Sequence, residues 1–341
     1  MAVLTDEFTA EREAIDLGLR SAVDRLPAPA SRVASYHFGW TDPEGAPIEG
    51  SSGKALRPLL TLLAAGAVAS GDREAWRPAV PAAVAVELVH NFSLIHDDII
   101  DRDTVRRHRA TVWKVFGSTE ALLVGDALHA LAFEVLGEAD PSRVAAGAGT
   151  LAATVRALID GQLSDTRFER RERVGIAECT AMSEAKTASL MACATELGGL
   201  FGGGSAEQAA ALRDFGFRLG LAFQHVDDLL GIWGDPEVTG KPAFSDLRLR
   251  KKSLPVTAAL GSGRPEAAEL TRLYAGTGPL DDAQVHRAAE LVEACGGRRS
   301  SRESADVLTA SAAARLESAD LSAEAVAALH GLAATTVGRA C

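Results

Sequence analysis

Long runs of apolar residues at helical spacing recur along this chain, and they constrain its fold more than any other feature. The runs cover residues 56–71, 79–101, 119–137, 141–168, 176–200 and 206–234 and continue into the C-terminal third. Ala and Leu dominate these runs, whereas the 341 residues include only 2 tyrosines, so intrinsic preference favours helix over strand. No alternating strand pattern of convincing length and no sharp change of composition interrupts them. The sequence therefore predicts an all-α fold with one domain over residues 1–341.

Prolines and glycines place the expected breaks near the N-terminus. The first 30 residues predict a helix that ends at Pro27 and Pro29. The segment from Tyr36 to Gly53 is rich in Gly, Pro, Asp and Ser, which predicts a loop too long for a tight turn. Loops of this length are often functional.

The charge and the cysteines exclude several classes of protein. A formal net charge of -11 argues against a nucleic-acid-binding protein, so local basic residues would have to meet an anionic ligand. Cys179, Cys193, Cys295 and Cys341 form no close pair, which fits neither a disulfide framework nor a zinc site and favours a reducing cytoplasm. An acidic N-terminus and the lack of about 18 consecutive uncharged apolar residues predict neither a signal peptide nor stable membrane insertion.

A cluster of aspartates ends the helix expected over residues 84–101. Leu88, Phe92, Ile95 and Ile99 form an ordinary core stripe. A second stripe is polar, because spacings of seven and four place His90, Asp97 and Asp101 on one face, with Asp98 about 100° around the helix from Asp97. Carboxylates this close repel one another, so we expect cations to compensate them.

A second apolar helix repeats the pattern with Asp227 and Asp228. An isolated pair of aspartates is often only a solvated helix end, but the repetition favours a shared function. Magnesium prefers oxygen ligands and is commonly held between a few carboxylates and substrate phosphates. Two facing carboxylate clusters would suit a diphosphate.

Basic residues follow both clusters. Any one of them alone is more often a solvated surface charge, but together they exceed the needs of one diphosphate. A lysine and an arginine three residues apart, Lys54 and Arg57, also lie where a helix is expected to begin and where free amides favour an anion. The others are Arg106, Arg107, Arg109, Lys241, Lys251 and Lys252.

Taken together, these motifs resemble those of the trans-prenyltransferases, the polyprenyl diphosphate synthases of the isoprenoid synthase fold. The resemblance runs from about Gly53 to Pro255. It rests on GKALRP at 53–58, VELVHNFSLIHDDIIDRDTVRRHRATVW at 86–113, GDAL at 125–128, KTA at 186–188 and FQHVDDLLGIWGDPEVTGKP at 223–242. It implies a helical bundle around a deep central cavity, a homodimer, and about three Mg2+ ions per active site.

The resemblance also assigns roles to individual residues. Asp97, Asp101 and Asp227 resemble direct metal ligands, and Asp98 and Asp228 resemble their supports. The residues that resemble contacts to the allylic diphosphate are Arg106, Lys186 and Lys241, with Thr187 and Gln224 close to that site. The pocket for isopentenyl diphosphate would consist of Gly53, Lys54, Arg57, His90 and Arg107.

The implied reaction needs no side-chain base. The metal ions and basic residues would stabilise the departing diphosphate, and the isopentenyl double bond would attack the allylic cation left in an apolar cavity. In the family the released diphosphate accepts the final proton. His90 and His96 are thus interpreted as binding or structural residues.

Product length in this family depends on side chains just before the first cluster. Phe92 lies five residues before Asp97 and Ser93 lies four before it. An aromatic residue followed by a small one resembles enzymes that stop near C20, which predicts geranylgeranyl diphosphate as the product. Phe92 could alternatively serve only core packing.

Three positions depart from the family pattern. Gly231 stands where many relatives have a third aspartate, and Phe244 stands where the family usually has glycine. Ala110 replaces a common proline after the paired arginines.

These departures keep three alternatives open. A terpene cyclase of the same fold would need the same ionisation but no second substrate, and Lys54, Arg57, His90 and Arg107 argue against it. A non-catalytic partner subunit of a prenyl synthase would be expected to lose metal ligands, which this chain keeps. A metal phosphohydrolase built on His96 and Asp97 would explain neither the second cluster nor GKALRP.

Overall fold

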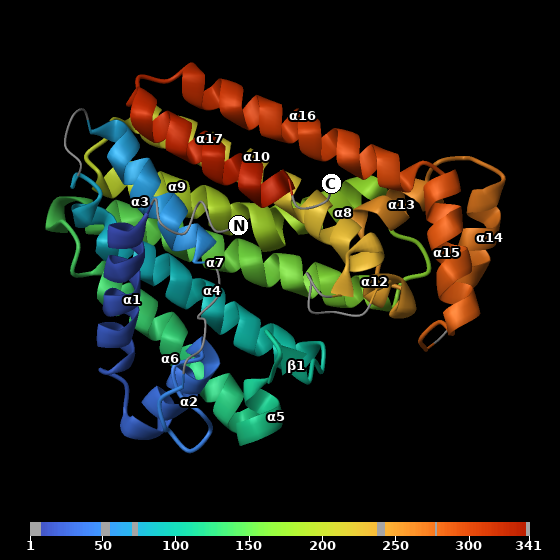
Figure 1. Cartoon of the computed structure of the whole chain (residues 1–341), viewed down its shortest axis with the longest axis horizontal. Coiled ribbons are helices and arrows are strands. Elements are labelled where there is room, and N and C mark those ends of the chain that lie inside the picture. Colours follow the sequence, from blue (N-terminus) through green and yellow to red (C-terminus); the bar gives the residue numbers. More distant parts are fainter. Residues whose placement is uncertain (1–7, 49–54, 70–73, 237–242, 277, 339–341) are drawn as a thin grey trace. The chain divides into compact units, whose positions relative to one another are not determined.

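A computed structural model describes residues 8–48, 55–69, 74–236, 243–276 and 278–338. Nearly all of the regular structure in these residues is helical (Figure 1). The described strands are the two-residue β1 (Val105–Arg106) and β2 (Arg109–Ala110), which form one small hairpin. The prediction of an all-α fold is confirmed.

Helices occur where the apolar spacing predicts them. The structure contains α3 (Leu56–Val68), α4 (Val80–Ile100), α6 (Ser118–Leu136), α7 (Pro141–Glu169) and α10 (Ala206–Trp233). The run over residues 176–200 is divided into α8 (Ile176–Ser183), the π-helical segment η3 (Glu184–Ala188) and α9 (Ser189–Phe201). Single π-helical turns of this kind are frequent at functional sites.

The N-terminal region differs from the expectation. The first helix, α1 (Thr9–Val23), ends before the prolines, and α2 (Ala28–Phe38) begins directly after Pro27. Proline suits the first turn of a helix because its missing N–H would have no partner there. The expected loop therefore begins at Gly39, whose φ of 80° ends α2, and not at Tyr36.

The described residues form two compact units. The first draws on residues 1–155, 190–213 and 316–329, and the second on 156–189, 214–315 and 330–341. Five of the described helices contribute residues to both units, namely α7, α9, α10, α16 (Gly297–Glu317) and α17 (Ala323–Val337). The single domain expected from the sequence stays a prediction.

The core of the first unit is built on α4, which packs along α6 (Figure 1). Leu88 and Ile95 of the predicted apolar stripe are completely buried, and Phe92 is 7% exposed. The 3-10 helix η2 (Arg77–Ala79) leads into α4, and the short α5 (Val112–Phe116) follows the hairpin.

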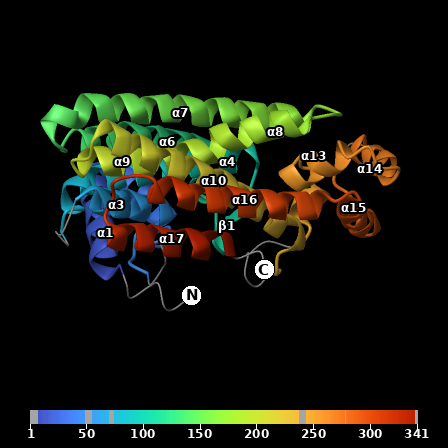
Figure 2. The same ribbon diagram turned by 90° about the horizontal axis from the view of Figure 1, so that it is seen from above.

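The second unit has its own hydrophobic core. Ile232 at the end of α10, Leu247, Val256, Leu270 and Val292 belong to it. They come from α12 (Ser245–Arg248), α13 (Leu254–Leu260), α14 (Glu266–Tyr274) and α15 (Asp282–Ala294). Figures 1 and 2 both show α14 beside α15, and α16 (Gly297–Glu317) follows them in the chain.

Among the residues that the structure describes, one helical stretch, Arg77–Ile100, is long and apolar enough to cross a membrane. Inside the protein, however, 67% of its most apolar window is buried, as is usual for a core helix.

The cysteines within the described residues, Cys179, Cys193 and Cys295, are free thiols and buried. Burial raises the pKa of Cys179 and that of Cys193 to about 12.

Candidate active site

The first aspartate cluster lies at the C-terminal end of α4, where its three carboxylates differ in burial. Asp97 is half-buried and Asp101 is exposed, while Asp98 is only 1% exposed. The buried Asp98 carboxylate accepts hydrogen bonds from Arg106, with Nη2 2.7 Å and Nε 2.9 Å from Oδ1. Burial raises the pKa of Asp98, and the Arg106 guanidinium opposes that shift. Asp97 and Asp101 thus reach solvent one turn apart, as expected for metal ligands.

The hairpin after this cluster presents the paired arginines. Arg106 ends β1, and Arg107 and His108 form a two-residue turn with φ values of 51° and 62°. Positive φ at both turn residues is the type I′ geometry, which normally favours Asn and Gly. Arg107, predicted to contact isopentenyl diphosphate, thus sits at the tip in a strained backbone conformation.

Two of the residues predicted for the isopentenyl diphosphate pocket meet in the first unit. Arg57 Nη1 lies 3.2 Å from His90 Nε2. Burial, followed by the charges of Arg57 and Arg107, lowers the pKa of His90 well below its usual value, so the neutral ring can accept from Arg57. The role of His90 in binding isopentenyl diphosphate stays a prediction. Gly53 and Lys54 lie outside the described residues.

Behind Arg57 and His90 lies a polar chain that the sequence analysis missed. Asn91 Nδ2 donates to the buried Glu87 carboxylate at 3.0 Å, and Asn91 Oδ1 lies 3.0 Å from His37 Nε2. This orientation of Asn91 assigns the His37 proton to Nε2. Burial and the nearby Arg107 and Arg106 lower the pKa of His37 to about 3. The spacing of Glu87 four residues before Asn91 was the available signal.

The residues predicted to govern product length differ in their surroundings. Phe92 packs on His129 of α6, with ring centroids 4.9 Å apart, and its edge meets His96 at 5.7 Å. Ser93 is half-buried and donates to the His90 carbonyl of its own helix at 2.8 Å.

His96 has a structural role. A Cβ on Gly125 would lie 2.1 Å from His96 Nε2, so the glycine of the GDAL motif makes room for the ring. The same nitrogen is 3.1 Å from the Leu122 carbonyl oxygen.

The second cluster, on α10, also pairs an exposed aspartate with a buried one. Asp227 is exposed, whereas Asp228 is 3% exposed. Asp228 accepts hydrogen bonds from Gln224 Nε2 and from the Leu254 backbone N–H, each at 2.8 Å. Thr187 donates to Gln224 Oε1 at 2.6 Å, so the predicted residues Thr187, Gln224 and Asp228 form one chain. Burial raises the pKa of Asp228 to about 7, although Lys251 opposes the shift.

Lys186 projects from the π-helical segment and has an acidic partner. Its Nζ lies 2.7 Å from Asp165 Oδ2 on α7. A Cβ on Gly161 would approach the Lys186 backbone nitrogen to 2.6 Å, so α7 meets this segment closely only because residue 161 is glycine. Asp165 was not anticipated. Lys241 lies outside the described residues.

The departures at positions 231 and 244 have local explanations. A Cβ on Gly231 would lie 2.4 Å from Asp246 Oδ2, so the Asp246 carboxylate occupies the space of the side chain that many relatives have. Phe244 has a φ of 61°, a conformation that explains the family's usual glycine there. Its side chain packs on the core of the second unit and meets His286 at 5.0 Å. The Asp246 carboxylate therefore lies beside this cluster, although it comes from α12 and not from α10.

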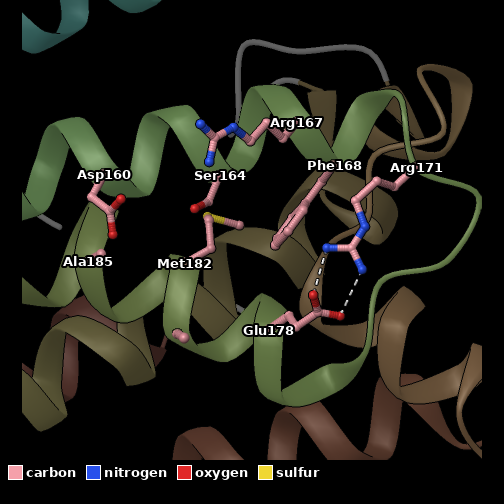
Figure 3. A pocket seen from close by; sticks show the side chains of 9 residues that line it. Asp160, Ser164, Arg167, Phe168, Arg171, Glu178, Met182 and Ala185 are labelled. Atoms are coloured by element: carbon pink, nitrogen blue, oxygen red, sulfur yellow. Dashed lines mark hydrogen bonds and ion pairs between the residues drawn. The ribbon is translucent and has the colours of Figure 1, made fainter.

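A cavity of about 320 Å³ lies between α7 and α8 (Figure 3). Phe168 and Met182 supply its apolar lining, and Arg171 is paired with Glu178 across it at 2.6 Å. As far as the described residues show, its lining includes none of the predicted site residues, although Ala185 adjoins Lys186.

The donor atoms suit magnesium. Exposed or half-exposed carboxylates lie in the C-terminal part of both helices, and their buried neighbours are already engaged by hydrogen bonds. Within the described ranges, no three His, Cys, Asp or Glu side chains gather into a complete metal site. Magnesium commonly uses only one or two carboxylates and completes its shell with water and phosphate oxygens.

Comparison with known proteins defines the class. The profile of the polyprenyl synthetase family matches residues 47–292. The chain belongs to this family of magnesium-dependent prenyltransferases, and it is a polyprenyl diphosphate synthase of the short-chain trans type.

The similar proteins include synthases named for two different products, farnesyl diphosphate and geranylgeranyl diphosphate. The chain is 47% identical over 290 residues to a (2E,6E)-farnesyl diphosphate synthase of Mycobacterium tuberculosis, covering 84% of this chain and 80% of that one. It is 42% identical over 312 residues to a geranylgeranyl diphosphate synthase of the same species, covering 91% and 88%.

Solved structures share the fold. A polyprenyl synthetase from Streptomyces coelicolor is 44% identical with a TM-score of 0.89, covering 96% of this chain and 98% of that one. A geranylgeranyl pyrophosphate synthase from Corynebacterium glutamicum, complexed with isoprenyl diphosphate and magnesium, is 26% identical with a TM-score of 0.80, covering 97% and 98%. The isoprenoid synthase fold expected from the motifs is thereby confirmed.

Proposed function

We propose that this protein condenses isopentenyl diphosphate with an allylic prenyl diphosphate and releases mainly geranylgeranyl diphosphate. The observation that carries the product length is the immobilised ring of Phe92 beside the small Ser93. Ser93 shares a helix face with Asp97 one turn away, so its small side chain leaves room beside the diphosphate end of the substrate. Phe92 lies about 7.5 Å along α4 from Asp97 and is held by His129 and His96, which suits it to stop a growing chain.

The carboxylates divide into ligands and supports in this proposal. Asp97, Asp101 and Asp227 hold the magnesium ions, about three per active site. When bound, these ions would stabilise negative charge on the departing diphosphate. Asp98 keeps Arg106 in place through its bidentate contact, and Asp228 fixes Gln224 and Thr187.

The cations bind the two substrates. Arg106, Lys186 and Lys241 contact the allylic diphosphate, and Asp165 orients Lys186. Gly53, Lys54, Arg57, His90 and Arg107 receive isopentenyl diphosphate. No side chain is assigned as a base, in agreement with the neutral, arginine-bound ring of His90.

The test is a product assay. The purified protein is incubated with magnesium and farnesyl diphosphate, with and without isopentenyl diphosphate, and the diphosphates and volatile hydrocarbons are identified by mass spectrometry. A C20 diphosphate that requires isopentenyl diphosphate is expected. Failure to extend farnesyl diphosphate in the presence of isopentenyl diphosphate would contradict the chain-length proposal, and a hydrocarbon formed without isopentenyl diphosphate would point to a cyclase.

We also propose that the protein is a homodimer in the cytoplasm. In the first unit, α4 and α6 expose Ile100, Leu122 and Leu123 at 48%, 49% and 60%. In the second unit, α7 exposes Ile159 and Leu163 one turn apart. Large apolar side chains on such surfaces favour burial against another protein surface. Sedimentation equilibrium should give twice the chain mass, and Leu123→Glu should shift the protein towards monomer.

A further inference from the structure

The hairpin β1–β2 is held in a conformation that its own sequence does not favour. Arg107 and His108 occupy the left-handed region at both positions of the turn, where a side chain costs free energy. Such strain persists only when surrounding contacts impose it. The contacts that impose it come from the last turn of α2 and the loop after it.

Arg109 is one of these contacts. Its Nη1 donates to the Tyr36 carbonyl at 2.8 Å and its Nη2 to the Thr41 carbonyl at 3.0 Å. Its guanidinium also lies over the Tyr36 ring, 4.2 Å from the centroid. The third arginine of the basic run is therefore directed at the protein backbone, unlike the anion-binding role that the sequence suggested for the run as a whole.

Tyr36 completes the attachment from the other side. It is 5% exposed, its ring meets the edge of Phe116 at 5.3 Å, and its hydroxyl donates to the Ala110 carbonyl at 2.8 Å. The next residue, His37, bonds to Asn91 of α4. The end of α2 thus connects the hairpin to the helix that carries the first aspartate cluster.

We propose that Tyr36 and Arg109 are positioning residues that hold the hairpin so that Arg106 and Arg107 meet a diphosphate. This inference rests on the proposed function of those two arginines. It also explains how the chain tolerates Ala110 in place of the family proline, because the hydroxyl bond to Ala110 supplies the rigidity that a proline ring would give. The residue that replaces the family proline, Ala110, is thus the same residue whose carbonyl accepts the Tyr36 hydrogen bond.

The pairing of the hairpin allows that exchange to be tested directly. Arg106 pairs with Arg109 beside the two-residue turn, and Val105 pairs with Ala110. In this register the 105–110 pair is the one without mutual hydrogen bonds, so a proline at 110 removes no bond of the ladder. Ala110→Pro should therefore restore stiffness without breaking the hairpin.

The experiment compares Tyr36→Phe, Ala110→Pro and the double variant. Binding of inorganic pyrophosphate with magnesium is measured by calorimetry, and KM and kcat are measured for both substrates. Loss of one hydrogen bond should raise the pyrophosphate Kd and the KM for isopentenyl diphosphate about fivefold, with kcat within about twofold. The double variant should return to within about twofold of the natural protein. Hydrogen exchange of the amides over 104–111 should quicken in Tyr36→Phe and slow again in the double variant.

A second variant tests the arginine. Arg109→Lys cannot keep both carbonyl contacts and should weaken pyrophosphate binding by a similar factor. Arg264→Lys is the matched control, since Arg264 also donates to a backbone carbonyl, that of Ala294 at 2.8 Å. It should leave pyrophosphate binding unchanged.

Two results would overturn the inference. One is a Tyr36→Phe protein with lowered thermal stability but unchanged Kd and KM, which would make Tyr36 a packing residue only. The other is failure of Ala110→Pro to rescue. A further outcome is that the natural protein fails to elongate prenyl chains while Tyr36→Phe still weakens pyrophosphate binding and Ala110→Pro restores it. That result would contradict the proposed function but support the positioning role of Tyr36.

Discussion

The two aspartate clusters use the same residues at the ends of two apolar helices, but their buried members are stabilised differently. Asp98 on α4 is matched by a guanidinium from a hairpin eight residues later. Asp228 on α10 is matched by a neutral amide and a backbone N–H, with the Lys251 charge acting in addition. The third position also differs, with the exposed Asp101 in one cluster and Gly231 beneath the Asp246 carboxylate in the other. Both clusters therefore place one aspartate towards solvent and one in the interior, but the charge that surrounds the buried carboxylate differs between them.

The largest effect is expected at the aspartates that reach solvent, Asp97 and Asp227, where the clusters should behave alike. Asp97→Ala and Asp227→Ala each remove a proposed magnesium ligand and should lower kcat about 10²- to 10³-fold, as for loss of other groups that stabilise transition-state charge. Steady-state kinetics with titrated magnesium measures this. The exposed Asp306 on α16 provides the control, since Asp306→Ala should retain full activity. A large effect for only one of the two would show that the clusters are not equivalent in catalysis.

The buried carboxylates should separate the clusters. Asp98→Asn leaves the Arg106 guanidinium without its buried counter-ion and should cost about 3 kcal/mol of unfolding free energy. Asp228→Asn keeps one acceptor oxygen for neutral partners and should cost about 1–2 kcal/mol. Urea unfolding in the presence of a chelator measures both without metal. Equal losses would indicate that Lys251 is as important to Asp228 as Arg106 is to Asp98.

Alanine substitution should destabilise the protein at Gly231, the third position of the second cluster, but stabilise it at a glycine with free space around it. Gly231→Ala places a methyl group against Asp246 and should cost about 1 kcal/mol or more, in spite of the better helix propensity of alanine. Gly149→Ala on α7 is the matched control, because nothing lies within 4 Å of its added methyl group, and it should stabilise by about 0.5–1 kcal/mol. Stabilisation by Gly231→Ala would show that Asp246 moves aside without cost.

The last comparison concerns pH, and a group in each unit should change the pH dependence of stability in the opposite direction. The pKa of Asp228 is raised from 3.8 to about 7, so the folded state binds more protons between these values, and its contribution to stability is lost as pH rises towards 7. The pKa of His37 is lowered from 6.5 to about 3, so its contribution is lost as pH falls through that window. In chelator, Asp228→Asn should therefore make the slope of stability against pH more positive between pH 4 and 7. His37→Gln should make it less positive. A slope that neither variant changes would show that other groups control it.

Local patterns predicted much of this molecule, and long-range contacts account for what they missed. Apolar spacing placed α3, α4, α6, α7 and α10 because burial of one face is a local property of the sequence. The family resemblance assigned Arg57 and His90 to one substrate site and Thr187 and Gln224 to another. The structure places the two members of each pair in contact.

The residues that were missed act across large separations. Tyr36 bonds to a residue 74 positions later, and Lys186 meets Asp165, 21 positions earlier. The π-helical segment η3 and the start of α2 after Pro27 were also missed. Apolar periodicity reports neither a widened helical turn nor the restart of a helix next to proline. The roles assigned to the metal ligands stay predictions until the variants are measured.

Each unit contains a buried cysteine whose rate of alkylation would report how often that unit opens. Cys193 lies in the first unit and Cys179 in the second, and a thiol whose pKa is about 12 has almost no thiolate at pH 8. Alkylation of either side chain by a thiol reagent therefore has to wait for the surrounding helices to open. Peptide mass spectrometry after timed labelling should report the opening of the two units separately in a single sample, with the natural cysteines as the labelled sites.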